Sequence, residues 1–317
     1  NKQGLIETVG SGEPRIDFKD DAKGALLLEP SRSNAITYSE DFTQWTLFNT
    51  TVTSNNAVSP DGTQNADLIN ISNVSHLIYI QSSVVAETKY TFSFFFKSGT
   101  KDFVEIAFYN DTANSFIATN VSQSSVDYGN GWKRIIAEVT TPVGCSSIYS
   151  YIDRSSGIGN YYIYGAQAEQ GSYATSHIPT QGGAVTRVAD VSSQTVPSGI
   201  ISQTSGTLFI EFPNLDNTFA FIGLSESGGN SNRMVIYSSG DNILDAQFRQ
   251  DSVVKLSAST GVLSGVVKVS LSFSSTESVL YVNGSQISVG TASVWSALNE
   301  FNLNQANQIG AKVSEIK

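Results

Sequence analysis

The stretch that decides the fold runs from Tyr161 to Val191 and reads YYIYGAQAEQGSYATSHIPTQGGAVTRVADV. Its first four residues are aromatic or β-branched, which is typical of a β-strand. Gly165, Pro179 and a run rich in Ser, Thr and Gly then indicate an irregular connection. A shorter apolar–polar run over residues 185–191 leads into a further series of strand-like segments. We therefore predict that one β-domain ends in this stretch and that a second begins.

On both sides of this stretch, apolar residues recur mostly at every second position, which is the period of a β-strand. Phe92, Phe94 and Phe96, for example, share one face of an expected strand. The expected strands of the first half are 77–81, 90–97, 103–109, 133–139, 148–152 and 161–164. Those of the second half are 206–212, 219–225, 233–237, 243–249, 252–258 and 266–273. Short strands at this spacing predict β-sandwiches.

The pattern divides the chain into three parts. Residues 1–35 are expected to form a turn-rich N-terminal strap laid on the first domain, 36–180 the first domain and 181–317 the second. Asn283-Gly284, between two apolar runs, predicts a tight hairpin in the second domain. The chain stops within a strand-like pattern, KVSEIK, so further residues are expected beyond it. The predicted fold class is all-β, with two tandem antiparallel β-sandwiches.

Composition narrows the classes of function. The 317 residues carry a net charge of −10, which argues against nucleic-acid binding because phosphates need clustered Lys and Arg. Only 15% of the residues are charged, so the surface is expected to be neutral and polar, as suits an extracellular or particle-borne protein. Cys145 is the single cysteine and has no internal disulfide partner. No apolar run is long enough for membrane insertion.

The opening stretch also carries a resemblance. Through GAQAEQGSYATSHIPT (165–180) and AVTRVADV (184–191), it is similar to the junction in tail-fibre and other appendage proteins of tailed bacteriophages. In those proteins a jelly-roll, carbohydrate-binding-module-like domain precedes a concanavalin-A/laminin-G-like domain. Further similar strings are GLIETVGSGEPRIDF (4–18), LLLEPSRSNAITYSEDFTQW (26–45), SPDGTQNADLI (59–69) and NGWKRI (130–135).

The resemblance implies a non-catalytic module of a virion appendage, a tail or head fibre. Its implied partners are a host cell-surface glycan or other virion proteins, and the implied assembly is a homo-oligomer, with a trimer favoured. Two alternatives stay open from the residues themselves. One is the carbohydrate-binding portion of a secreted polysaccharide-degrading enzyme, and the other is a purely structural spacer.

Motifs for catalysis are absent from the sequence. His76 and His177 are the two histidines, and HEXXH, GXSXG, P-loop and GXGXXG patterns do not occur. A glycosidase needs two carboxylates roughly 5–10 Å apart. The carboxylates in or beside expected strands are Glu105, Asp127, Glu138 and Glu211. Carboxylates on the solvent face of a strand are ordinary, so we predict that the chain is not an enzyme.

A metal site is a separate question. Jelly-roll modules of the kind that the sequence resembles often carry a structural calcium between their first and last strands. Calcium takes six to eight oxygen ligands, among which carboxylates and carbonyls are mixed. The candidate ligands here are Glu40, Asp41, Asp61, Asp67 and Glu169. Asp61 has a competing explanation, because Asp-Gly favours turns whether or not a metal binds.

Aromatic stacking is the expected mode of glycan binding in the first domain, because sugars present apolar C–H faces to rings. Tyr149 and Tyr151 should share the face opposite to Ile148 and Ile152. The alternative is that these tyrosines only cover the sheet. Trp45 and Trp132 are expected to lie in the core, because each follows a turn and leads into a strand.

In the second domain, the candidate ligand-binding residues are Arg233, Tyr237 and Arg249, which lie on expected strands. Arginine pairs well with the carboxylates of acidic sugars. The competing explanation is a solvated or ion-paired arginine on a strand.

Overall fold

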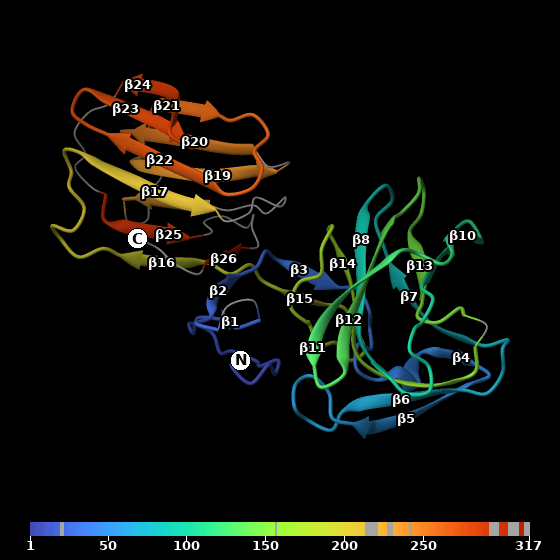
Figure 1. Cartoon of the computed structure of the whole chain (residues 1–317). Coiled ribbons are helices and arrows are strands. Elements are labelled where there is room, and N and C mark those ends of the chain that lie inside the picture. The colour runs from blue at the N-terminus through green and yellow to red at the C-terminus, as the bar shows by residue number, and fades with distance from the viewer. Residues whose placement is uncertain are drawn as a thin grey trace. The chain divides into compact units, whose positions relative to one another are not determined.

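The computed structural model describes residues 1–19, 22–155, 157–212, 221–226, 231–240, 243–291, 298–303 and 311–313. Within these ranges the only helical element is the short 3-10 helix η1 (Phe42–Gln44), and all other regular elements are β-strands (Figure 1). No helix in this described part of the chain is long and apolar enough to cross a membrane. The predicted all-β class is confirmed.

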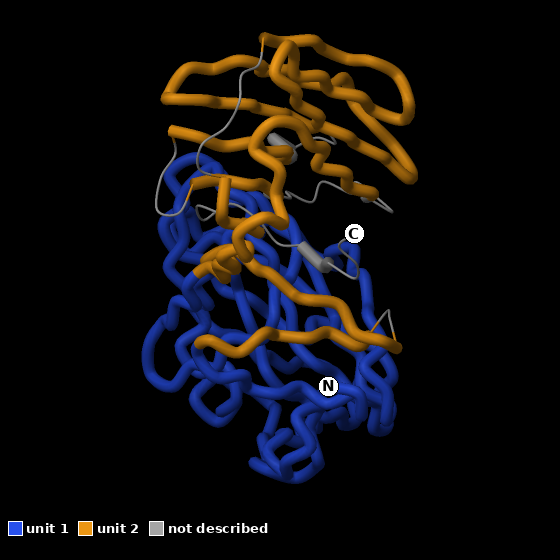
Figure 2. Tube along the Cα trace, turned by 90° about the vertical axis from the view of Figure 1, so that its left-hand side faces the viewer, with its two compact units in different colours: residues 1–11, 32–188 blue, residues 12–31, 189–317 orange. Residues whose placement is uncertain are grey.

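The chain forms two compact units, coloured separately in Figure 2. Unit 1 comprises Asn1–Ser11 and Arg32–Val188, and unit 2 comprises Gly12–Ser31 and Ala189–Lys317. The segment 1–35, expected as one strap on the first domain, is therefore divided, and its residues 12–31 belong to unit 2. The reason lies in the side chain of Arg15, which forms ion pairs with Glu29 and with Asp190.

Unit 1 is a sandwich of two antiparallel sheets. The six-stranded sheet has the order β11-β12-β8-β14-β6-β5, and the five-stranded sheet has the order β10-β9-β13-β7-β4. The strands of the first are β5 (Thr50–Ala57), β6 (Ala66–Ile71), β8 (Lys89–Ser98), β11 (Gln123–Gly129), β12 (Trp132–Thr140) and β14 (Gly159–Gln170). Those of the second are β4 (Thr46–Phe48), β7 (Leu77–Ser83), β9 (Ala107–Asn110), β10 (Ser115–Ala118) and β13 (Ser147–Tyr151).

This strand order is that of a jelly roll. Strands β6-β14-β8-β12 form the middle of one sheet and β7-β13-β9-β10 lie side by side in the other. The chain thus crosses between the two sheets at most of its connections, and the late strand β14 lies next to the early strand β6. The predicted jelly roll is confirmed by this topology.

The main core of unit 1 lies between the two sheets. Phe92, Phe94 and Phe108 are buried there, as their alternation predicts, and Trp45 joins them. Trp132 does not. It is buried in a second apolar cluster with Phe95 and Tyr164, and its ring N–H donates to the Val58 carbonyl at 3.0 Å. The predicted burial of Trp132 is confirmed, and its cluster follows from alternation, because 135, 137 and 139 face the main core and therefore turn 132 to the other face of β12.

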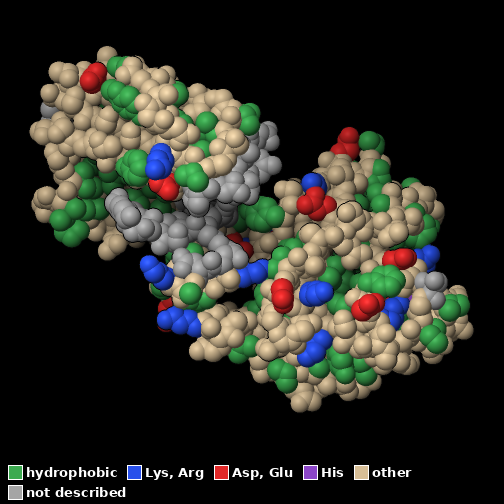
Figure 3. All heavy atoms as spheres, in the orientation of Figure 1, with side chains coloured by type: hydrophobic (Ala, Val, Ile, Leu, Met, Phe, Trp, Pro, Cys, Tyr) green, Lys and Arg blue, Asp and Glu red, His purple; other side chains and the backbone are tan. Residues whose placement is uncertain are grey.

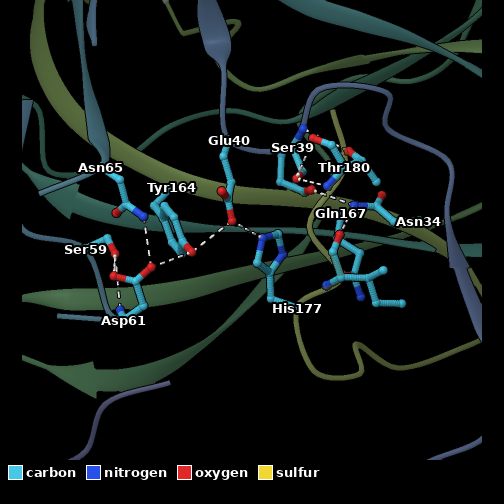
Figure 4. Close-up of polar contacts among 12 residues, drawn as sticks. Asn34, Ser39, Glu40, Ser59, Asp61, Asn65, Tyr164, Gln167, His177 and Thr180 are labelled. Carbon is cyan, nitrogen blue, oxygen red and sulfur yellow. Dashed lines mark hydrogen bonds and ion pairs between the residues drawn. The ribbon is translucent and has the colours of Figure 1, made fainter. Parts of the chain in front are cut away.

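The opening stretch forms β14 and a hydrogen-bonded clasp around its second half (Figure 4). At Gly165, with a φ of 58°, a β-bulge interrupts the pairing between β14 and β8. Beyond the bulge, the buried Asn34 amide donates to the carbonyls of Ala166 (3.1 Å) and Ile178 (2.9 Å). Its carbonyl accepts from the Ala168 N–H at 3.0 Å. Several residues of the stretch 165–180, which carries the sequence resemblance, thus form hydrogen bonds that hold the end of the jelly roll together.

A small two-stranded sheet of β3 (Arg32–Asn34) and β15 (Val185–Arg187) completes unit 1 beside this clasp. The buried Gln167 amide also stabilises this region, because its oxygen accepts a hydrogen bond from the Ile178 N–H at 2.7 Å.

The strand expected over 103–109 is shorter in the structure, where β9 begins at Ala107.

Unit 2 is the second antiparallel sandwich. Its six-stranded sheet has the order β16-β25-β18-β19-β20-β21 and its four-stranded sheet the order β17-β22-β23-β24. The strands of the first are β16 (Ser192–Thr195), β18 (Phe221–Ser225), β19 (Arg233–Gly240), β20 (Ile243–Gln250), β21 (Val253–Ser259) and β25 (Glu300–Leu303). Those of the second are β17 (Gly206–Phe212), β22 (Val267–Phe273), β23 (Glu277–Val282) and β24 (Ser285–Thr291).

The predicted hairpin of unit 2 is confirmed, because Asn283 and Gly284 connect β23 to β24 with φ values of 49° and 81°. Both sheets contribute to one core, with Phe248 from the larger sheet and Leu271 from the smaller. A three-stranded sheet joins the early strands β1 (Ile16–Asp17) and β2 (Ala25–Leu28) to β26 (Ala311–Val313). The last residues of the strand-like pattern KVSEIK, 314–317, lie outside the described residues.

Candidate functional site

Five aromatic side chains gather on the outer face of the five-stranded sheet of unit 1. They are Tyr79 on β7, Tyr109 on β9, Phe116 on β10, and Tyr149 and Tyr151 on β13. The strand register places Tyr149 opposite Tyr109, and Tyr151 opposite Tyr79. Their neighbours in sequence, such as Ile148, point into the core. We call these five residues the aromatic face.

The five rings form a closed circuit of neighbours. Ring centroids are 4.9 Å apart for Tyr79 and Tyr149, and 4.7 Å for Tyr79 and Tyr151. The circuit continues from Tyr151 to Phe116 (6.0 Å) and from Phe116 to Tyr109 (5.0 Å). Tyr109 and Tyr149 close it, with ring planes only 5° from parallel at 5.8 Å. Because each ring contacts two others, their orientations are mutually restrained.

The predicted pair Tyr149 and Tyr151 does come together on this face, but the two rings differ in accessibility. Tyr149 is half-buried, whereas Tyr151 is 8% exposed. A place on the outer face does not make Tyr151 accessible, because neighbouring rings and the Arg154 guanidinium cover it. Phe116 is instead the most exposed ring of the five, at 42%.

Neither Tyr79 nor Phe116 was singled out from the sequence. Tyr79 lies between Ile78 and Ile80 on an expected strand, so the same alternation that pointed to Tyr149 could have found it. Phe116 had no comparable signal. Strand β10 is short, and its place beside Tyr109 depends on a pairing that bulges between Phe116 and Ala118.

Polar groups lie at two sides of the circuit. On one side, the Arg154 guanidinium lies 5.3 Å from the ring centroids of both Phe116 and Tyr151. On the other side, the Asp111 carboxylate accepts a hydrogen bond from the Gln81 amide at 2.8 Å. A hydrogen bond to Asp111 together with burial raises the pKa of Tyr149 to about 12, so its hydroxyl keeps its proton at neutral pH. The face thus combines rings with donors and acceptors at its rim.

The five candidate calcium ligands do not form one set. Asp41 accepts from the Thr43 N–H as the cap of helix η1, and Asp67 accepts from the Phe42 N–H. Glu169 is buried and accepts from the backbone and hydroxyl of Thr175. Each of these three carboxylates therefore accepts hydrogen bonds from nearby backbone or hydroxyl donors.

Glu40 and Asp61 do share a neighbour, as Figure 4 shows. The Tyr164 hydroxyl lies 2.9 Å from Glu40 and 3.0 Å from Asp61, and His177 Nε2 lies 3.0 Å from Glu40. The hydrogen bond with His177 lowers the pKa of Glu40. Within the described ranges, no group of three or more His, Cys, Asp or Glu side chains is placed to hold a metal ion. Structural calcium stays a prediction without a ligand set there.

The candidates of unit 2 also lie on one sheet face. Arg233 on β19 lies directly opposite Arg249 on β20, and Tyr237 lies opposite Asp245. The Arg233 guanidinium donates to the Gln247 side chain at 2.6 Å. Burial and the neighbouring charge of Arg249 lower the pKa of Arg233. A role for these residues in ligand binding stays a prediction.

Comparisons with known proteins add little to this geometry. No protein-family model matches the sequence, and no curated protein matches it. Among solved structures, sheep galectin-11 in complex with glycerol matches with a TM-score of 0.26 at 10% identity, over 39% of this chain and 91% of that chain. Domains LG4-5 of the mouse laminin alpha1 chain match with a TM-score of 0.29 at 10% identity, over 74% of this chain and 83% of that chain. At TM-scores this low, the similarity supports no statement about the function of this chain.

Proposed function

We propose that unit 1 is a non-catalytic carbohydrate-binding module and that its ligand lies on the aromatic face. The observation that carries the proposal is the closed circuit of five rings on the outer face of a sheet. Sugar rings present flat C–H faces that pack on such surfaces, while rim groups such as Arg154 and Gln81 bond the hydroxyls. The aliphatic residues beneath the circuit make it part of the packed sheet, so the rings lose little conformational freedom on binding.

The surroundings of the histidines support a non-catalytic role. The His76 side chain is buried with Nε2 at 3.7 Å from Asp153, and that of His177 is buried beside Glu40. Neither side chain belongs to the aromatic face. Glu138 and Glu211, two of the carboxylates considered for a glycosidase, each pair with an exposed lysine on a strand.

We also propose that the module serves in a virion appendage of the tail- or head-fibre type and acts outside the cell on a host-surface glycan. The sequence resemblance over most of the chain supports this setting. A stacking ring contributes on the order of 1 kcal/mol, so one module would bind weakly. Many copies on one particle would raise the effective concentration, which favours a homo-oligomer such as a trimer. The low charged fraction fits this setting: in Figure 3 most of the visible surface is uncharged.

The test is binding to a panel of immobilised bacterial-surface polysaccharides by the wild-type chain and single variants. Tyr149→Ala and Phe116→Ala should each weaken binding about five-fold, because each removes roughly 1 kcal/mol of stacking. The matched control is Phe48→Ala, on β4 of the same sheet, a ring that is 53% exposed and outside the circuit. This control should bind like the wild type.

The double variant of Tyr149 and Tyr151 is a poor test of the site, because Tyr151 is nearly buried. Its truncation would disturb packing as well as stacking. If Tyr149→Ala and Phe116→Ala fold normally and bind the panel as the wild type does, carbohydrate binding at this face is wrong. A wild-type chain that binds no polysaccharide would favour the structural spacer.

A further inference from the structure

We infer that the aromatic face selects an anionic sugar, a uronate or a sulfated residue, and that Arg154 pairs with its carboxylate or sulfate group. This inference rests on the proposed carbohydrate binding at the same face and specifies the ligand class. It starts from the position of one exposed cation on the ring circuit.

The Arg154 guanidinium is held over two rings at once, Phe116 and Tyr151, each at 5.3 Å. A guanidinium stacked on a ring keeps its N–H edges free for a partner in the same plane. The backbone is fixed as well, because the Arg154 N–H donates to the Glu105 carbonyl at 2.8 Å. The charge is therefore presented at a set position beside the most exposed ring of the circuit.

Each of the other arginines of unit 1 has at least one carbonyl, hydroxyl or carboxylate partner within the protein. Arg134 donates to the Thr175 carbonyl at 2.6 Å and to Ser93, and Arg187 donates to the Ser176 carbonyl. Arg32 lies 3.7 Å from the Glu169 carboxylate. Among the described residues, the Arg154 side chain has only its two ring contacts and no carboxylate or carbonyl partner. An unsatisfied planar fork of donors matches the geometry of a carboxylate or sulfate.

Charge at the other side of the circuit limits the ligand further. Asp111 lies there, hydrogen-bonded to Gln81, and would repel a second anionic group. The protein as a whole carries a net charge of −10, so general electrostatic attraction does not favour anionic polymers. Selection for an anion must therefore come from a local contact, and a glycan in which acidic and neutral residues are adjacent fits both sides.

The experiment compares binding of matched probes that differ in charge: polygalacturonate against its methyl ester, and dextran sulfate against dextran. At low salt the wild-type chain should bind the charged member of at least one pair about ten-fold more tightly, which is the scale of one charge-assisted contact. Arg154→Gln should remove that preference, so that the charged and the neutral member of each pair bind with similar affinity. Arg154→Lys should retain part of it, because it keeps the charge and loses the fork.

The control variant is Lys133→Gln, an exposed cation on β12 in the other sheet, which should keep the preference. A wild-type chain that binds the neutral members equally well overturns the inference and leaves carbohydrate binding intact. A preference that persists in Arg154→Gln also overturns it. A chain that binds none of the probes and none of the polysaccharide panel overturns both proposals. Thermal unfolding of each variant checks that the fold is retained.

Discussion

The ammonium nitrogen of Lys101 lies 2.7 Å from Asp153 Oδ2 in the interior of unit 1. The same nitrogen donates to the Ser155 hydroxyl at 2.7 Å and to the Gly157 carbonyl at 3.0 Å. Both charged side chains are almost fully buried. Arg154 lies between two of these residues in sequence, so the buried pair anchors the segment that presents the cation of the aromatic face.

Replacement of Lys101 by Met should destabilise unit 1 by about 3–5 kcal/mol, because the Asp153 carboxylate would stay buried without its partner. Urea unfolding followed by tryptophan fluorescence measures this. The control is Lys89→Met, which breaks the exposed pair with Glu138 and should cost about 1 kcal/mol or less. Similar losses in both variants would contradict the structural role of the buried pair.

Asn34→Ala should be as damaging as a large core truncation. The buried amide makes four hydrogen bonds, to Ala166, Ile178, Ala168 and Ile36. Unsatisfied buried groups cost about 1–3 kcal/mol each, so a loss of more than about 3 kcal/mol is expected. Amide hydrogen exchange of Ala168 should accelerate in this variant. Asn73→Ala, which removes one exposed hydrogen bond, should change neither measurement.

The stability of unit 1 should depend on pH through Asp61. Burial alone would raise the pKa of Asp61, but hydrogen bonds from Thr63, Asn65 and Ser59 outweigh it and lower the pKa from 3.8 to about 2. The folded-state pKa lies below the unfolded one, so this stabilisation is complete above about pH 4 and is lost as the pH falls through about 2.

This pH dependence is tested by measuring the free energy of unfolding of the wild type and of Asp61→Asn across that pH interval. The wild type should lose stability more steeply than the variant as the pH falls, because the variant has no carboxylate to protonate at this position. Parallel curves would show that other groups carry the acid dependence.

Much of the fold was predictable because its signals are local. The alternation of apolar residues predicted the strand over 90–97. Asn283-Gly284 predicted the hairpin of unit 2, where both residues have positive φ angles. The division of the N-terminal segment was not predictable, since it depends on Arg15 meeting Asp190 across 175 positions of sequence. The burial of Trp132 was predicted, but not the cluster in which it lies, although the alternation of β12 indicates its face.

By itself, then, the sequence determined which residues share a face of each strand, because that follows from the two-residue period of the backbone. Tyr149 was identifiable on these grounds. Only the tertiary structure decided that rings from four strands meet in one circuit and that Arg154 lies over two of them. Strand order and register come from pairings between distant segments, so no local pattern contains them.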